Sequence, residues 1–143
     1  MSVGARVLIV DDEPDILLML RVNLEADGYQ TALAADGETA LKRIGEEHFD
    51  VVLLDVMMPV MDGWSVLEHL RDHHNPPAVI VVSAKSANRD VARALDLGAS
   101  DFVAKPFSPM QLSALVEQLL SMTVEERAIH RSQTRGKLDI DYP

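Results

Sequence analysis

The sequence predicts an α/β fold in which helices cover both faces of a five-stranded parallel sheet. Short β-branched runs alternate with helical stretches five times along the 143 residues, as in doubly wound sheets. Two runs, residues 7–10 and 51–54, are continuously apolar, as central strands buried on both faces are. The chain has no cysteine, which excludes a disulfide framework and a thiolate metal site.

The predicted elements follow one another in strict alternation. We place the strands at residues 6–10, 30–34, 51–54, 78–82 and 102–104. Residues that typically begin or end helices flank the stretches between them. They are Pro14 and Gly28 around the first helix, Asp36 before the second, Pro76 and Pro77 after the third, Gly98 after the fourth, and Ser108 and Pro109 before the fifth.

The chain divides into one domain, residues 1–122, and a short C-terminal segment, residues 123–143. Thr123 and Glu126 form a capping-box signature, which predicts a helix to about Ser132. A segment of this length cannot bury a core of its own. We therefore interpret it as a short helix followed by a tail or linker.

Acidic residues outnumber basic ones by 23 to 13, which gives a formal net charge of −10. This charge argues against direct contact with nucleic acid, because phosphate binding needs a basic surface. The N-terminus does not resemble a signal peptide, and the apolar runs are too short to cross a bilayer. We expect a cytoplasmic protein without a membrane partner.

Polar side chains follow four of the five predicted strands. Asp11 and Asp12 follow the first, Asp55 the third, Ser83 the fourth and Lys105 the fifth. In a doubly wound sheet the ligand binds beyond the carboxyl ends of the strands, where the strand order reverses. Carboxylates that meet there stay ionised only beside an ammonium group or a divalent cation. Lys105 supplies the first, and oxygen ligands suit Mg²⁺ together with a phosphoryl group.

Several motifs, in order, resemble the receiver domain of two-component response regulators. They are VLIVDDE (residues 7–13), LLDVMMP (residues 53–59) with Asp62-Gly63, Ser83-Ala84, and GASDF (residues 98–102) leading to Lys105-Pro106-Phe107. The resemblance covers about residues 5–122. It implies a flavodoxin-like, CheY-like sheet with the strand order 2-1-3-4-5.

The resemblance implies a phosphoryl-transfer site. Asp55 would be the phosphoacceptor, and its donor would be a phosphohistidine on a sensor histidine kinase or a histidine phosphotransfer protein. Lys105 would pair with the phosphoryl oxygens, and the Ser83 hydroxyl would donate a hydrogen bond to one of them. Mg²⁺ would be held by these groups: Asp12, Asp55 and the main-chain carbonyl of Met57 directly, and Asp11 through a water.

The resemblance also implies a conformational switch. Phe102 stands where the family places a rotating aromatic residue, often Tyr, and would act with Ser83. Because Phe102 has no phenol oxygen, switching would depend on burial of the ring. The surface formed by residues 86–120 would then change and control an output partner or a downstream domain. The family also predicts a cis peptide bond between Lys105 and Pro106.

Two other functions remain open on the sequence alone. A degenerate receiver could serve as a phosphorylation-independent binding module, although the complete set of Asp12, Asp55, Ser83 and Lys105 argues against this. A hydrolase with an aspartyl-phosphate nucleophile needs a second acid two residues later, where this chain has Met57. A receiver phosphorylates and slowly dephosphorylates itself, so we do not expect an enzyme in the usual sense.

Surface residues give further hypotheses. Leu18 and Val22 lie four residues apart on the first helix, either as isolated apolar residues or as a docking patch for the kinase. His69 and His73 have the spacing of metal ligands, but a solvated helix face is the favoured interpretation. A homodimer is possible through an apolar contact at Leu115. The kinase, the output and the extent of the whole regulator stay open.

Overall fold

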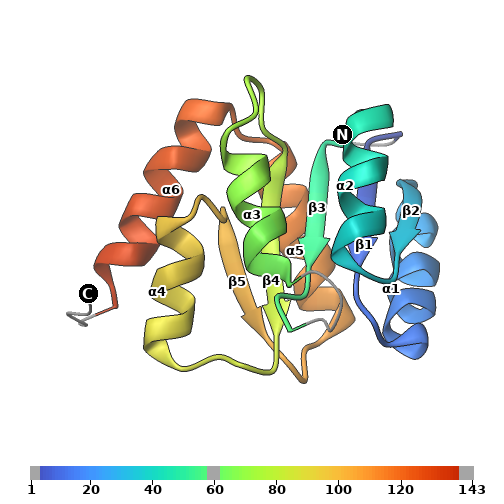
Figure 1. Ribbon diagram of the computed structural model, residues 1–143, viewed down its shortest axis with the longest axis horizontal. Helices are drawn as coiled ribbons and strands as arrows, with labels where there is room; N and C mark the ends of the chain where they lie inside the picture. Colours follow the sequence, from blue (N-terminus) through green and yellow to red (C-terminus); the bar gives the residue numbers. More distant parts are fainter. Residues whose placement is uncertain (1–3, 58–61, 139–143) are drawn as a thin grey trace.

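The computed structural model describes residues 4–57 and 62–138, and within them five parallel strands form one sheet (Figure 1). The strand order is β2-β1-β3-β4-β5, which confirms the prediction. The strands are β1 (Arg6–Val10), β2 (Gln30–Ala34), β3 (Val51–Leu54), β4 (Ala78–Ser83) and β5 (Asp101–Ala104). The helices are α1 (Pro14–Ala26), α2 (Gly37–Glu46), α3 (Gly63–Arg71), α4 (Asn88–Asp96), α5 (Pro109–Leu120) and α6 (Val124–Gly136). Residues 58 and 59 of the LLDVMMP motif lie outside the described residues.

Two apolar cores form, one on each face of the sheet. Successive side chains of a strand point to opposite faces. Leu8 and Val10 of β1 therefore pack on the side of α2, α3 and α4, whereas Val7 and Ile9 pack on the side of α1 and α5. All residues of β3 and β4 are buried, because these strands are covered on both sides. The buried sheet thus fixes the positions of the residues that follow its strands.

The register of the central strands sets the predicted site residues side by side. Val10 of β1 pairs with Leu54 of β3, so Asp11 and Asp55 come next on adjacent strands. The N–H of Asp55 donates to the carbonyl of Val10 at 2.9 Å. The chain proceeds from β1 to β2 on one side, while β3 lies on the other. The strand order therefore reverses at the point where these acids lie, which is where such sheets bind ligands.

The start of α3 lies very close to the carboxyl end of β3. A Cβ atom on Gly63 would collide with the backbone of Asp55 and Val56. The N–H of Gly63 donates to the carbonyl of Val56 at 3.3 Å, and the Asp62 side chain caps the helix by accepting from the N–H of Ser65 at 2.9 Å. Glycine is therefore required here because its backbone touches the backbone of the site.

Helix α6 is longer than the sequence predicts. The expected end was about Ser132, whereas the helix continues to Gly136, and the predicted capping box at its start is confirmed. No proline or glycine interrupts the chain before Gly136, and Arg135 in the last turn forms an ion pair with Asp96 of α4 at 3.0 Å. This tertiary contact stabilises a turn that local signals alone did not indicate.

Candidate functional site

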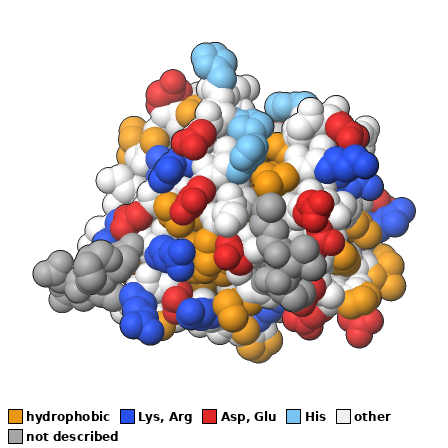
Figure 2. Space-filling model, in the orientation of Figure 1, with side chains coloured by type: hydrophobic (Ala, Val, Ile, Leu, Met, Phe, Trp, Pro, Cys, Tyr) orange, Lys and Arg blue, Asp and Glu red, His pale blue; other side chains and the backbone are white. Residues whose placement is uncertain are grey.

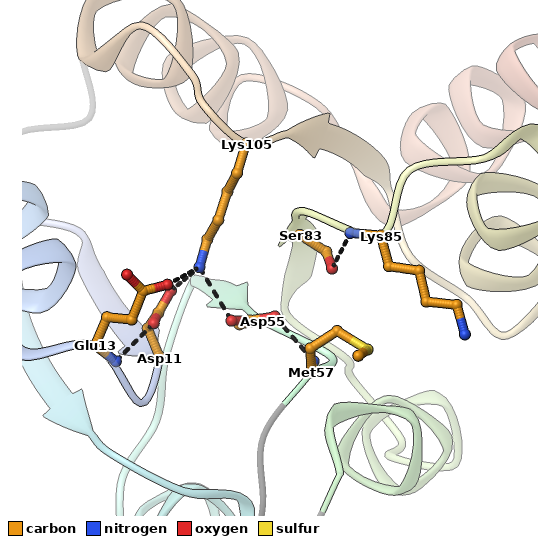
Figure 3. A network of polar contacts seen from close by, with 7 residues as sticks. All are labelled: Asp11, Glu13, Asp55, Met57, Ser83, Lys85 and Lys105. Carbon is orange, nitrogen blue, oxygen red and sulfur yellow. Dashed lines mark hydrogen bonds and ion pairs between the residues drawn. The ribbon is translucent and has the colours of Figure 1, made fainter.

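Lys105 is the centre of a polar cluster beyond the carboxyl ends of β1, β3 and β5 (Figure 3). Its Nζ atom donates to Oδ2 of Asp11 at 2.8 Å, to Oδ2 of Asp55 at 3.0 Å and to Oε1 of Glu13 at 3.2 Å. The peptide bond from Lys105 to Pro106 is cis, as predicted. The fold thus joins residues that lie 94 and 50 positions from the lysine in the sequence.

The cluster is largely shielded from water. The side chains of Asp11 and Asp55 are each 4% exposed and that of Lys105 is 11% exposed, whereas Glu13 is 59% exposed. Two carboxylates in a shielded site lose hydration and repel each other, so they need a cation between them. The ammonium group of Lys105 is that cation in this structure.

Backbone N–H groups hold the two buried carboxylates in position. Oδ1 of Asp11 accepts from the N–H of Glu13 at 2.9 Å, and Oδ1 of Asp55 accepts from the N–H of Met57 at 2.9 Å. Both bonds run from an aspartate to the residue two positions later, which is the pattern of an Asx turn. Each carboxylate therefore has one oxygen fixed by the backbone and one directed at Lys105.

The surroundings favour the charged form of Lys105 and disfavour the charged form of Asp55. Burial raises the pKa of Asp55; the Met57 N–H and Lys105 lower it, and the charge of Asp11 raises it further. Burial lowers the pKa of Lys105, but hydrogen bonds and charges from Asp11 and Asp55 outweigh this effect and raise its pKa above the ordinary value. Additional positive charge near Asp55 would therefore stabilise its ionised carboxylate.

Four acids could share a metal ion here. Each can place one carboxylate oxygen within 4.8 Å of the others: Asp11, Asp12, Glu13 and Asp55. An all-oxygen set of this kind fits Mg²⁺, which binds one or two carboxylates and keeps several waters. Glu13 was not among the predicted ligands, although it is the third acid of the motif. Asp12 is exposed while Asp11 is buried, so solvent reaches the cluster from the side of Asp12.

The predicted switch residues Ser83 and Phe102 border the cluster, and the backbone N–H of Lys105 donates to the carbonyl of Ser83 at 3.0 Å. The Oγ atom of Ser83 is buried and accepts from the N–H of Lys85 at 3.1 Å; none of the hydrogen bonds among the described residues links it to Asp55 or Lys105. The side chain of Lys85 extends away from the acids (Figure 3). Phe102 is half-buried and packs against the core on the α3 face. The Met57 carbonyl remains a predicted ligand.

His69 lies exposed on α3, whereas His73, which was expected on the same helix, lies beyond its end at Arg71. Figure 2 shows histidine side chains near the tip of the molecule, and acidic and basic side chains interspersed over this face. The rings of His69 and His73 meet edge to face at 5.6 Å, and histidine is not part of the potential metal group found among the described residues. Leu18 and Val22 are each 60% exposed. No described helix has the length and apolar character to cross a membrane.

The fold and the site together define a class: a doubly wound α/β domain with an acid–lysine cluster at its topological switch point. The sequence profile of the response regulator receiver domain matches residues 7–117. The chain belongs to this family of two-component signalling domains. This confirms the family that the motifs indicated.

Known relatives and solved structures support this assignment. The chain is 41% identical to the alkaline phosphatase synthesis transcriptional regulatory protein PhoP of Bacillus subtilis, over 80% of this chain and 48% of that protein. It is 38% identical to the DNA-binding response regulator MtrA of Mycolicibacterium smegmatis, over 96% of this chain and 59% of that protein. The chain thus spans roughly half the length of these curated relatives.

Solved receiver domains share the fold over most of the chain. The receiver domain of the Francisella response regulator 1452 matches with a TM-score of 0.78 and 34% identity, covering 82% of this chain and 97% of that one. The BeF3-activated DrrB receiver domain matches with a TM-score of 0.77 and 30% identity, covering 83% and 99%. In both comparisons, part of this chain lies outside the region that is shared with the solved receiver domain.

Proposed function

We propose that this receiver domain accepts a phosphoryl group on Asp55 from a phosphohistidine, and that phosphorylation controls an output. The observation that carries the proposal is the contact of Lys105 with two buried carboxylates, Asp55 and Asp11, at 3.0 and 2.8 Å. An ammonium group in this place can neutralise the charge of an incoming phosphoryl group. A sensor histidine kinase or a histidine phosphotransfer protein would supply that group.

The position of Asp55 favours it over Asp11 as the acceptor. β3 lies between β1 and β4, so Asp55 has Asp11 on one side and Ser83, at the end of β4, on the other. A phosphoryl group on Asp55 can therefore meet Lys105 and the Ser83 hydroxyl together. Asp11 follows β1, whose other neighbour, β2, ends in Ala34, which offers no side-chain donor.

The transfer itself needs little from the protein beyond positioning. An oxygen of the Asp55 carboxylate attacks the phosphorus atom of the phosphohistidine. The new P–O bond forms as the P–N bond breaks, and the electron pair of the P–N bond returns to the imidazole of the donor. The Met57 N–H keeps one Asp55 oxygen fixed at 2.9 Å. Bound Mg²⁺ would offset negative charge on the carboxylates and phosphoryl oxygens, and Asp11, Asp12, Asp55 and the Met57 carbonyl would hold it.

The output follows from what phosphorylation does to neighbouring strands. Ser83 pairs with Ala104 of β5, so a shift of Ser83 toward a phosphoryl oxygen pulls on β5 and on Phe102 within it. The α4-β5-α5 surface would change and contact an output protein, a downstream domain or a second copy of the chain. The described domain would act in the cytoplasm, touch no nucleic acid itself and turn over no free substrate.

One experiment tests the acceptor. The chain is incubated with acetyl phosphate and Mg²⁺, and its intact mass is measured. The parent chain should gain one phosphoryl group, and Asp55→Asn should gain none. Asp15→Asn, which changes an exposed acid on α1, is the matched control and should behave as the parent. Phosphate on the Asp55→Asn chain would refute the assignment.

A further inference from the structure

Helix α6 lies against the outer edge of the sheet, outside the region that the receiver profile matches. It packs beside α4 and the start of β5, which is the edge strand (Figure 1). Polar contacts between described residues hold it there, among them His130 with Asp101 at 2.9 Å, Arg135 with Asp96 at 3.0 Å, and Arg127 with the carbonyl of Pro76 at 3.1 Å. None of the residues of α6 is buried. The helix is therefore held mainly by polar groups and contributes little to either core.

The carboxylate of Asp101 connects this helix to the predicted switch residue. Its Oδ2 atom lies 2.9 Å from Nε2 of His130 on α6. Its Oδ1 atom accepts from the backbone N–H of Phe102 at 2.8 Å. The side chains of Asp101 and His130 are only 18% and 20% exposed, so water screens this contact weakly. One carboxylate thus ties α6 to the residue whose ring would move on phosphorylation.

The packing beneath α6 is imperfect. A cavity of about 120 Å³ remains between α6, α3 and the start of β4. The described residues that line it include three arginines, Arg71, Arg127 and Arg131, and no acid. The pKa of Arg127 is lowered by burial and by the charge of Arg131. The like charges of Arg127 and Arg131 repel each other where α6 docks, so they offset part of the stabilisation that its polar contacts provide.

We propose that α6 is a displaceable cover over the outer surface of α4 and β5, and that Asp101 couples its docking to the position of Phe102. The coupling to phosphorylation rests on the proposed function of Asp55, whereas the link between α6 and Phe102 does not. When Ser83 pulls on β5, Asp101 moves away from His130. The contact with α6 breaks, and the α4-β5 surface is uncovered for the output.

The link between α6 and Phe102 can be tested without phosphate. The full chain is labelled with fluorinated phenylalanine, which gives signals from its three Phe residues, and Phe102→Tyr identifies the signal of Phe102. His130→Ala should shift that signal, whereas Ile129→Ala, a change of an exposed α6 residue, should leave it in place. An unshifted Phe102 signal in a folded His130→Ala chain would overturn the proposal.

The coupling to phosphorylation needs a distance measurement. Because the chain has no cysteine, spin labels can be placed at Lys42→Cys on α2 and Ser132→Cys on α6, both exposed positions. Acetyl phosphate with Mg²⁺ should lower the ratio of docked to undocked α6 by about fivefold or more, at the low end of typical allosteric couplings. An unchanged distance in a chain whose mass shows the phosphoryl group would refute the coupling. A chain that takes no phosphate refutes the function of Asp55 instead, and the fluorine comparison still decides the link.

Discussion

The Nζ atom of Lys105 lies 3.0 Å from Oδ2 of Asp55, although 50 residues separate them in the sequence. The same nitrogen lies 2.8 Å from Asp11, so one ammonium group bridges two buried carboxylates. The ammonium group offsets part of the repulsion between the two carboxylates before any ligand arrives. The site is therefore assembled in advance, and a phosphoryl group or a cation alters an existing balance of charge.

Removing the charge of Asp55 should stabilise the fold at neutral pH. Burial raises the pKa of Asp55 above its ordinary value of 3.8, so its contribution to stability is full below that value and is lost as pH rises through the folded pKa. Asp55→Asn should therefore be more stable than the parent chain at pH 7 without Mg²⁺. Urea unfolding across pH checks this: the advantage of Asp55→Asn should vanish in acid, and an advantage independent of pH would contradict it.

Magnesium should stabilise the folded chain through the acidic cluster. A ligand that binds only the folded state at 100 times its Kd adds about 2.7 kcal/mol. Thermal unfolding with and without MgCl₂ measures this gain. Asp12→Asn should reduce it strongly without harming the apo fold, because Asp12 is exposed. Asp15→Asn serves as the control, and an equal loss of Mg²⁺ response in both variants would exclude a specific site.

Loss of Lys105 should impair phosphoryl acceptance more than loss of a nearby lysine. Lys105→Ala leaves Asp55 without its cation, and we expect the rate of phosphorylation by acetyl phosphate to fall by roughly tenfold or more. Lys85→Ala removes a charge whose Nζ lies 3.9 Å from Asp90 and should change the rate by less than about twofold. The rates are compared by intact mass over time. Equal effects would mean that bulk charge, and not contact, matters.

Two glycine substitutions should have opposite effects on stability. Gly63→Ala introduces a Cβ that collides with the backbone of Asp55 and Val56, and should cost roughly 2 kcal/mol or more, as overpacking does. Gly45→Ala on α2 places its Cβ in open space and should gain about 0.5–1 kcal/mol from helix propensity. Denaturant unfolding measures both. A neutral Gly63→Ala would show that α3 can move away from the site.

The exposed apolar residues of α1 should affect phosphoryl transfer from the kinase but not from acetyl phosphate. Leu18 is 60% exposed, so Leu18→Glu should leave the fold intact. We expect it to slow transfer from a cognate kinase by about tenfold, the cost of losing one apolar contact of roughly 1.4 kcal/mol, while phosphorylation by acetyl phosphate stays unchanged. Loss of both reactions would instead indicate misfolding.

The sequence by itself determined the class of fold and the edge of the sheet at which the acids and the lysine meet. Alternation of apolar strands and helices is a local pattern, so β1 and β3 could be recognised from residues 7–10 and 51–54 alone. Acids and a lysine at the ends of strands then had to meet, because parallel strands present their carboxyl ends on one edge. For this reason Asp55 and Lys105 were expected at the same edge, and their side chains meet there at 3.0 Å.

The tertiary structure decided which of these acids is buried against Lys105 and which is exposed to solvent. Whether Asp11 or Asp12 turns inward depends on how the chain leaves β1, and only the folded chain shows Asp11 buried on Lys105 with Glu13 beside it. The place of α6 was equally hidden, because His130 meets Asp101 across 29 positions of sequence. Such pairings depend on the distance between surfaces that form only when the sheet is complete, and no local pattern encodes that distance.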